Sequence, residues 1–308
     1  MIADEVQHMT TPEPTDLAEA VIARMNDCVD ERFREVMTSL VRHLHAFARE
    51  VDLRPEEWMA AIEFLTATGQ ACNDHRQEFI LLSDTLGLSM AVVALDQARA
   101  LRAGAESARR ATEATVQGPF YWEGAPDMPL GCDLRADGVT GEPAYYSGEV
   151  TDTAGRPLAG ALLDIWSGNG EGVYDMQVQG QGMTLRGRLR TDANGRYRFW
   201  SIRPSEYPVP TDGPVGVMLK RMGRHAMRPG HIHLKVSAEG HVPLTTHLFP
   251  RGGRYLDSDA VFGVRESLIV DFDRHEPGIA PDGRRLSQPY YTARYDFRLV
   301  PQDPTSQR

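Results

Sequence analysis

Apolar side chains recur every three or four residues through the first part of the chain. In residues 16–50 this spacing begins with Leu17 and Val21, and it predicts an amphipathic helical segment. Pro55, followed directly by two acidic residues, predicts the first turn of a further helix. The run at residues 78–86 is apolar on more than one side, so we expect it to lie between packing partners.

The second part of the chain shows a different pattern, in which short apolar runs alternate with turn residues. Asn194-Gly195 is a strong hairpin signal, and we predict hairpin turns at residues 151–155 and 192–195. Short strands with frequent turns and no long helices between them indicate an antiparallel sandwich. The predicted strands are residues 146–150, 161–166, 185–191, 196–202, 215–219, 231–236, 244–248, 267–272 and 291–300.

Glycine and proline content places a boundary between these two parts near Gln117. Only 3 of the 28 glycines and 3 of the 20 prolines lie in residues 1–117. Because both residue types mark turns and are disfavoured inside helices, we predict an α+β protein with two domains. The first is a helical N-terminal domain at residues 1–117, and the second is a mostly antiparallel β-sandwich domain at residues 118–308.

Charge and cysteine content argue against several classes of protein. The formal net charge of −10 is opposite to the basic face of a nucleic-acid binder. No apolar run reaches the ~18 to 20 residues of a membrane span, and four acidic residues before position 17 do not fit a signal peptide. Cys28, Cys72 and Cys132 are odd in number and widely spaced, which is typical of free thiols. We therefore expect a cytoplasmic protein that binds neither nucleic acid nor membrane.

Candidate chemistry lies in the predicted strand that contains His231-Ile232-His233. Residues two apart on a strand leave the same face, so His231 and His233 project side by side and Ile232 points the other way. Two imidazoles on one face are half of a metal site, although they can also be ordinary hydrogen-bonded residues. Arg228 and a Pro-Gly corner lead into the pair, and His247 lies in another predicted strand.

The remaining ligands of such a site are not obvious from the sequence. A non-haem Fe(II) oxygenase adds a carboxylate to its histidine pair, but H-x-D and H-x-E are both absent here. Two of the ten tyrosines lie in unusual places, Tyr174 after a glycine-rich loop and Tyr207 between prolines that fix an irregular backbone. Periodicity alone does not select them, because most tyrosines are packing residues.

Five longer motifs surround these residues. They are RQEFILLSDTLGLSM from Arg76, ATEATVQGPF, LLDIWSGNGEGVYD, PSEYPVPTDGPVG and RPGHIHLKV. With them, residues 71–295 resemble the intradiol ring-cleavage dioxygenases of the catechol 1,2-dioxygenase type, and in particular their hydroxyquinol-cleaving branch. The combination is far more specific than the histidine pair alone.

The resemblance implies one Fe(III) per subunit, held by Tyr174, Tyr207, His231, His233 and a solvent molecule. Phenolate oxygens favour the hard ferric ion, and imidazole suits iron in either oxidation state. Similar enzymes bind a catechol-type diol as a chelating dianion, which displaces the phenolate of Tyr207, and this phenolate can accept a substrate proton. Dioxygen then inserts oxygen between the two hydroxylated carbons. Similar proteins also form homodimers through their N-terminal helices and hold phospholipid there.

Further site residues carry over by motif. Arg228 meets the need for a fixed cation beside the charge that builds on the ring. His247 stands where catechol-specific relatives tend to carry glutamine, and we interpret it as a group beside metal and substrate, with a purely structural role as the alternative. It could instead be a third imidazole ligand, which would put Tyr174 or Tyr207 in doubt. The implied substrate pocket consists of Leu81, Asp84, Val116, Gly118, Pro119, Phe120, Val209, Pro210 and Val261.

Asp84 is the unexpected member of that pocket, because an unpaired buried carboxylate is costly in so apolar a helix. It can accept a hydrogen bond from the third hydroxyl of a substrate. A helix-capping or salt-bridging role is an equal alternative.

The resemblance thus predicts cleavage of hydroxyquinol with O2 to 3-hydroxy-cis,cis-muconate, which tautomerises to maleylacetate. The alternative substrate is catechol or a substituted catechol, which gives cis,cis-muconates. A non-enzymatic alternative is a metal- or ligand-binding β-sandwich whose histidines are structural or hold Zn²⁺.

Overall fold

The computed structural model describes residues 14–102, 110–178, 180 and 182–302. Most of the acidic N-terminal residues used in the signal-peptide argument lie outside these residues. The chain divides into two compact units, Met1–Thr66 and Ala67–Arg308. This division follows contacts within the chain, and the compositional boundary near Gln117 stays a prediction.

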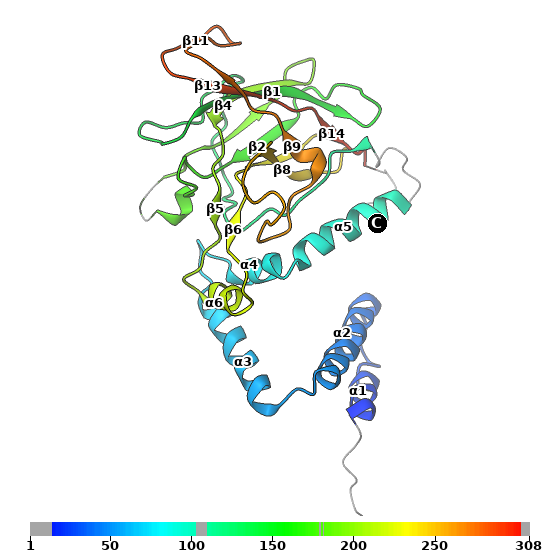
Figure 1. The fold of residues 1–308 in the computed structure, drawn as a ribbon. Helices are drawn as coiled ribbons and strands as arrows, with labels where there is room; N and C mark the ends of the chain where they lie inside the picture. Colours follow the sequence, from blue (N-terminus) through cyan, green and yellow to red (C-terminus); the bar gives the residue numbers. More distant parts are fainter. Residues whose placement is uncertain (1–13, 103–109, 179, 181, 303–308) are drawn as a thin grey trace, which may run out of the picture. The chain divides into compact units, whose positions relative to one another are not determined.

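The first unit contains α1 (Pro14–Ala23), α2 (Glu31–Glu50) and the beginning of α3 (Pro55–Gln70) (Figure 1). The single segment predicted over residues 16–50 is therefore two helices. Asp30 is the N-cap of α2, because its carboxylate accepts the Phe33 N–H at 2.9 Å, and it thus marks where the second helix begins. The start of α3 at Pro55 is as predicted.

The second unit begins with two more helices, α4 (Glu78–Thr85) and α5 (Leu88–Arg102). Leu81 and Asp84 of α4 are buried, but Phe79 and Ile80 are 47% and 42% exposed. The expectation that both sides of this segment are packed is therefore wrong within the single chain. Among the described residues no single helix is long and apolar enough to cross a membrane, although α4 and most of α5, bent by 70°, pass that test as a pair.

Helix α6 (Pro214–Arg221) replaces a predicted strand at residues 215–219. Pro214 stands in its first turn, where the missing N–H is harmless. The buried carboxylate of Glu78 accepts the Val215 N–H at 3.1 Å. Val215 and Leu219 are both buried, and their spacing of four residues places them on one face of a helix. A five-residue apolar run was too short to distinguish this spacing from a strand.

The first sheet is built around β1 (Pro143–Asp152), which has partners on both sides. Gly148 lies between the part of β1 that pairs with one partner strand and the part that pairs with the next. A Cβ there would lie 1.8 Å from the carbonyl oxygen of Tyr295, so only glycine fits. The partners are β4 (Arg196–Ile202), antiparallel, and β13 (Tyr290–Arg294) and β14 (Phe297–Leu299), both parallel, with β10 (Asp273–His275) beside β13.

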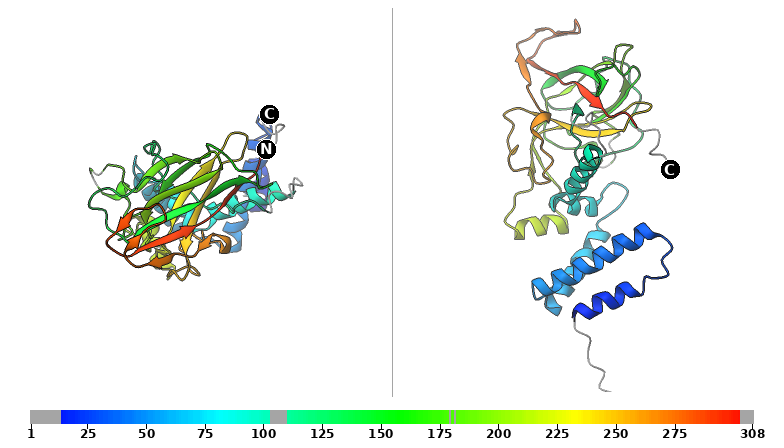
Figure 2. Two further views of the ribbon diagram at one scale, coloured as in Figure 1. Left: turned by 90° about the horizontal axis from the view of Figure 1, so that it is seen from above. Right: turned by 90° about the vertical axis from the view of Figure 1, so that its right-hand side faces the viewer.

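The second sheet carries the histidines and has the order β3-β2-β7-β8-β9. All of its pairings are antiparallel except β8 with β9. Figure 2 shows the strands of the two sheets as layers of one sandwich. The strands are β3 (Arg186–Arg190), β2 (Leu162–Trp166), β7 (Ile232–Ser237), β8 (Leu244–Pro250) and β9 (Ile269–Val270).

Side chains from both sheets form one hydrophobic core. The first sheet contributes Val150 and Phe199, and the second contributes Leu163, Ile165 and Ile232, all fully buried. The predicted α+β class with a β-sandwich is confirmed, although three pairs of strands are parallel. Short ribbons and 3-10 turns complete the fold: β5 (Tyr207–Pro208) with β6 (Met227–Arg228), β11 (Gly278–Ile279) with β12 (Arg285–Leu286), η2 (Asp175–Gln177) and η3 (Glu266–Leu268).

Both predicted hairpin turns form, and the first is followed by a short antiparallel pairing of Thr151 with Pro157, but neither turn joins the two strands predicted on its sides. The Gly195 N–H donates to the Asp192 carbonyl at 3.0 Å, and Gly155 makes the same bond to Asp152 at 2.9 Å. In each case the strands before and after the turn belong to different sheets. A turn motif fixes a local reversal of the chain, but the sheet that each strand joins depends on which apolar faces meet in the core. The strand predicted at residues 267–272 is also shorter, because it begins as η3.

We expect the sandwich core to dominate the stability of the second unit. Leu163 is fully buried between the sheets, so Leu163→Ala should lower the free energy of unfolding by about 2–5 kcal/mol. Chemical denaturation measures this loss. Ile279→Ala, at a side chain 65% exposed, is the control and should change it by less than about 0.5 kcal/mol. Equal effects of the two substitutions would contradict this assignment of the core.

Candidate metal centre

One row of side chains crosses the second sheet from β2 to β8. In the strand register Trp166 lies opposite His233, and His233 lies opposite His247. His231, two residues before His233, projects from the same face, and the Nε2 atoms of the two rings are 3.1 Å apart. Ile232 points the other way into the core, as the alternation along a strand predicts.

Two tyrosines from separate segments reach the same point. Tyr174 directly precedes η2, and Tyr207 in β5 lies opposite Arg228 in β6. The Tyr174 hydroxyl lies 3.0 Å from Nε2 of His233 and 3.4 Å from the Tyr207 hydroxyl. The Tyr207 hydroxyl lies 3.4 Å from Nε2 of His231. All four side chains are buried.

These four atoms have the spacing of ligands around one metal ion. Ligand atoms that each lie about 2 Å from a shared ion are separated by little more than 3 Å, as the distances above are. Two phenol oxygens and two imidazole nitrogens form a donor set that suits a ferric ion. The residues present therefore fit the metal that the resemblance implies, and their role as ligands stays a prediction.

The histidines are held in the neutral form that metal binding needs. Burial, and then the charge of Arg228, lowers the pKa of His231 to about 3. Burial also lowers the pKa of His233 well below its usual range, with neighbouring His247 and His231 adding to the effect. For the phenols the direction is opposite, since burial raises the pKa of Tyr174 well above its usual range. A bound cation is the natural means of removing the phenol protons.

His247 stands beside the four converging atoms. Its Nδ1 lies 2.9 Å from the Thr115 hydroxyl, and its Nε2 has no hydrogen-bond partner among the described residues. One ring nitrogen each of His231, His233 and His247 lies within 4.8 Å of the other two, so the three could also hold a metal ion together. Both interpretations of His247, neighbour and third ligand, stay open on this geometry.

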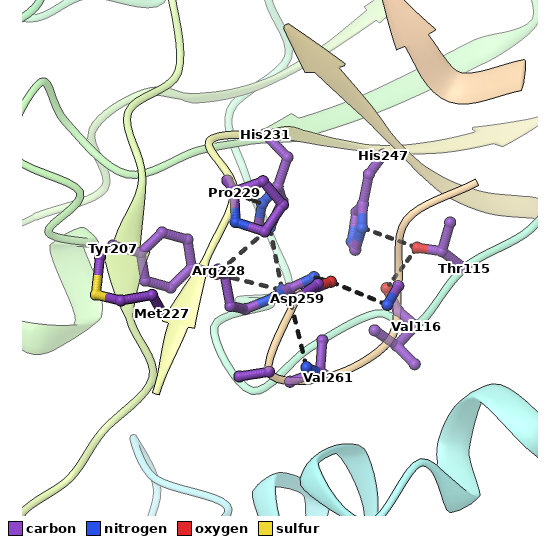
Figure 3. A network of polar contacts seen from close by, with 12 residues as sticks. Thr115, Val116, Tyr207, Met227, Arg228, Pro229, His231, His247, Asp259 and Val261 are labelled. Atoms are coloured by element: carbon purple, nitrogen blue, oxygen red, sulfur yellow. Dashed lines mark hydrogen bonds and ion pairs between the residues drawn. The ribbon is translucent and has the colours of Figure 1, made fainter. Parts of the chain in front are cut away.

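Arg228 reaches the site from β6 with its guanidinium fully buried (Figure 3). Its Nη1 donates to the Tyr207 hydroxyl at 3.3 Å and lies 3.1 Å from Nε2 of His231. The other side of the guanidinium pairs with Asp259, with Nε 3.0 Å from Oδ1 and Nη2 3.2 Å from Oδ2. A buried cation thus faces the tyrosine and histidine atoms, with its counter-charge behind it.

Part of the predicted pocket packs as one cluster and part lies against the tyrosine and histidine rings, and the role of these residues as a pocket stays a prediction. Leu81, Val116, Val209 and Val261 belong to one buried apolar cluster. Phe120 stacks on Tyr174 with ring centroids 4.6 Å apart, a Cβ on Gly118 would lie 3.4 Å from the His233 ring, and Pro119 and Pro210 are half-buried beside these residues.

Asp84 is buried on α4, one turn after Leu81. Burial is the main cause that raises its pKa, against a hydrogen bond from Ser89 and the charge of Arg228. The carboxyl group is therefore within electrostatic reach of the guanidinium. Its role in substrate binding stays a prediction.

Sequence reasoning missed several residues that support the site. Trp166 stacks on His233 with centroids 4.6 Å apart and planes 14° apart, and Thr115 holds His247. Arg186 and Asp175 form a buried ion pair next to Tyr174. The motifs that carried the resemblance contain Trp166, Thr115 and Asp175, but nothing local distinguishes these residues from packing or capping residues.

Comparison with known proteins identifies the family. A family model described as "Dioxygenase" matches residues 116–301, and one described as "Catechol dioxygenase N terminus" matches residues 30–104. The chain belongs to the intradiol ring-cleavage dioxygenases. It is 50% identical over 287 residues to 6-chlorohydroxyquinol 1,2-dioxygenase of Cupriavidus pinatubonensis, covering 93% of this chain and 97% of that protein.

Two further intradiol dioxygenases extend the comparison over nearly the whole chain. Hydroxyquinol 1,2-dioxygenase of Rhodococcus opacus is 46% identical over 286 residues, 92% of each chain. The crystal structure of hydroxyquinol 1,2-dioxygenase from Pseudomonas putida superposes with a TM-score of 0.81 at 43% identity, covering 94% of this chain and 99% of that one. The chain is thus an enzyme of a metal-dependent dioxygenase family, with the expected helical N-terminal region and β domain.

Metal content tests the proposed set of four ligands. We expect about one metal ion per chain by mass spectrometry of the metal, and His233→Ala should lower this content at least about tenfold. His241→Ala, at a histidine outside the proposed set whose Nδ1 lies 2.8 Å from the Glu239 carbonyl, is the matched control and should bind metal normally. A loss in His247→Ala as large as that in His233→Ala would make His247 a ligand and contradict the four-residue set.

Proposed function

We propose that this dioxygenase holds one Fe(III) with Tyr174, Tyr207, His231 and His233 and cleaves hydroxyquinol between its adjacent hydroxyl groups. Both atoms of O2 enter the product, 3-hydroxy-cis,cis-muconate, which tautomerises to maleylacetate. The convergence of two phenol oxygens on two imidazole nitrogens carries the proposal. Support for the substrate comes from the relatives above, whose names give hydroxyquinol or its 6-chloro derivative.

The bound ferric ion supplies Lewis acidity, which holds the diol as an anion and makes its ring reactive toward O2. Tyr207 would be the group that takes a substrate proton, in its phenolate form, and its oxygen lies within 3.4 Å of Tyr174, His231 and Arg228. Arg228 stabilises negative charge on the ring and on Tyr207. Because the guanidinium is buried, water screens this effect little.

Asp84 is the residue that distinguishes a triol from a diol in this proposal. Its carboxyl group is buried one turn after Leu81, a member of the apolar cluster, where a hydroxyl on the ring would be a suitable partner. A site built to bond a substrate hydroxyl discriminates against a substrate that lacks it, because the polar group of the protein is then left unpaired.

Catechol or a substituted catechol is the second candidate substrate. One observation favours it, namely the match of residues 30–104 to a model described as "Catechol dioxygenase N terminus". A metal-binding sandwich without redox chemistry has no support in the family.

We also propose a cytoplasmic homodimer that associates through its N-terminal helices and holds phospholipid there. The exposed apolar side chains of α1 and α2 support this, and the three cysteines, none of them in a disulfide, fit a reducing compartment. The exposed residues are Leu17, Val21, Phe33, Val36, Leu40, Leu44 and Phe47.

Activity and colour test the function together. Purified protein should absorb in the visible range through its iron-bound phenolates, and it should consume O2 with hydroxyquinol at a higher kcat/KM than with catechol, chlorocatechols or protocatechuate. A colourless protein that takes up no O2 with any of these compounds would refute the proposal. A preference for catechol would support the second candidate.

Asp84→Ala tests, in the same assay, whether Asp84 determines the preference for hydroxyquinol over catechol. We expect it to lower kcat/KM for hydroxyquinol by about tenfold or more and for catechol much less, because a buried hydrogen bond contributes about 1–3 kcal/mol. Equal losses on the two substrates would exclude a role in selectivity.

Sedimentation velocity tests the dimer. The protein should sediment with the mass of two chains, and Phe47→Asp, which places a charge on the exposed apolar face of α2, should shift it toward one chain. Organic extraction followed by mass spectrometry should release phospholipid. A wild-type protein that sediments as a monomer would contradict the proposal.

A further inference from the structure

The carboxylate of Asp259 lies directly behind the catalytic guanidinium and is as deeply buried. The side chains of Arg228 and Asp259 are each only 2% exposed. Two parallel contacts, Nε to Oδ1 at 3.0 Å and Nη2 to Oδ2 at 3.2 Å, fix the plane of the guanidinium. Nη1 is the nitrogen left over, and it faces the Tyr207 hydroxyl and His231.

The same carboxylate also organises the loop that follows it. Oδ1 accepts the Val261 N–H at 3.2 Å, and Oδ2 accepts the Gly263 N–H at 2.9 Å. A Cβ on Gly263 would lie 3.1 Å from Nη2 of Arg228 and 3.2 Å from Oδ2 of Asp259. The loop is thus closed tightly around the ion pair, and its member Val261 belongs to the apolar cluster of the pocket.

Each oxygen of Asp259 therefore accepts two donors, one from Arg228 and one from the loop. An ionised carboxylate can accept all four hydrogen bonds. The amide of an asparagine cannot, because in either orientation its NH2 group would face one guanidinium N–H and one backbone N–H. Burial would raise the pKa of Asp259, but the charge of Arg228 and its hydrogen bonds outweigh this and keep the pKa below its usual value.

We propose that Asp259 is the positioning residue of the reaction: it orients Arg228 so that Nη1 faces Tyr207 and the substrate ring, and it ties this orientation to the pocket wall at Val261. The proposal rests on the proposed function, in which Arg228 stabilises charge that develops on substrate. A preorganised cation is effective only in the correct orientation, since small displacements of a charged group cost large factors in rate.

The chain offers a control for the general cost of neutralising a buried carboxylate that accepts several hydrogen bonds, although here the partner arginine, Arg156, is 75% exposed. The Asp152 carboxylate is also buried, and it accepts the Arg156 Nε at 2.5 Å and the N–H groups of Ala154 and Arg156 at 2.9 Å. It lies at the end of β1, outside the site. Asp152→Asn should lower the melting temperature, as Asp259→Asn should, but leave kcat, KM and the visible spectrum unchanged.

The test compares Asp259→Asn, Arg228→Gln and the double variant. We expect Asp259→Asn to keep its iron, to shift the phenolate absorption band because Tyr207 loses its donor, and to lower kcat by about 10–100-fold with little change in KM. The double variant should be no slower than Arg228→Gln alone, because Asp259 acts through Arg228. A kcat of Asp259→Asn within threefold of the wild type, an unshifted band, or losses that multiply in the double variant would overturn the proposal.

Arg228→Lys keeps the test decisive where Asp259→Asn does not fold. Lysine retains the charge and can pair with Asp259, but it lacks the fork that bonds Asp259 and Tyr207 at once. Its kcat should fall as far as expected for Asp259→Asn, and near-normal turnover would overturn the proposal.

Anaerobic binding of 4-nitrocatechol separates this proposal from the proposed function. The dissociation constant of this probe should change less than about threefold in Asp259→Asn if orientation of the guanidinium, rather than loss of the pocket, is the cause. If the wild type prefers a diol over hydroxyquinol, the proposed substrate fails, and the same kcat comparison on that diol still decides the role of Asp259. A loss of 4-nitrocatechol binding equal to the loss in kcat would make Asp259 a merely structural residue.

Discussion

The antiparallel register of β2, β7 and β8 determines where the metal centre can form. It places Trp166, His233 and His247 in one row across the sheet. Because successive side chains leave opposite faces of a strand, a shift of one residue would turn His233 into the core and bring Ile232 to the site. The packing of the sandwich and the presentation of the imidazoles therefore depend on the same pairing, and neither can change without the other.

Charge at the site is arranged as a balance between buried groups. Arg228 and Asp259 cancel, and burial keeps the imidazoles neutral and the phenols protonated in the absence of a cation. The proposed ferric ion would bring three positive charges, of which the phenolates of Tyr174 and Tyr207 neutralise two. What remains favours an anionic ligand, which is the form in which a diol binds a Lewis acid.

The parts of this protein that follow local rules were predictable from its sequence. The alternation in His231-Ile232-His233 predicted two adjacent imidazoles, and Pro55 marked the start of α3. Residues 215–219 were misassigned because five apolar residues fit either a strand or the helix that the Glu78 carboxylate caps. The hairpin predicted at residues 192–195 failed because strand pairing is decided by packing far from the turn.

The site residues also differ in whether a local pattern of the sequence could reveal them. No spacing in the sequence separates Tyr174 and Tyr207 from the other tyrosines, and only longer motifs pointed to them. Asp259 was missed because its importance comes from Arg228, which the fold brings to it from 31 residues away. The order of the strands along the chain also affects how the protein folds. The early strand β1 finds two of its partners, β13 and β14, only near the end of the sequence. During synthesis its edge stays open until those last strands leave the ribosome, so the sheet closes late and slowly, as expected of a topology with high contact order.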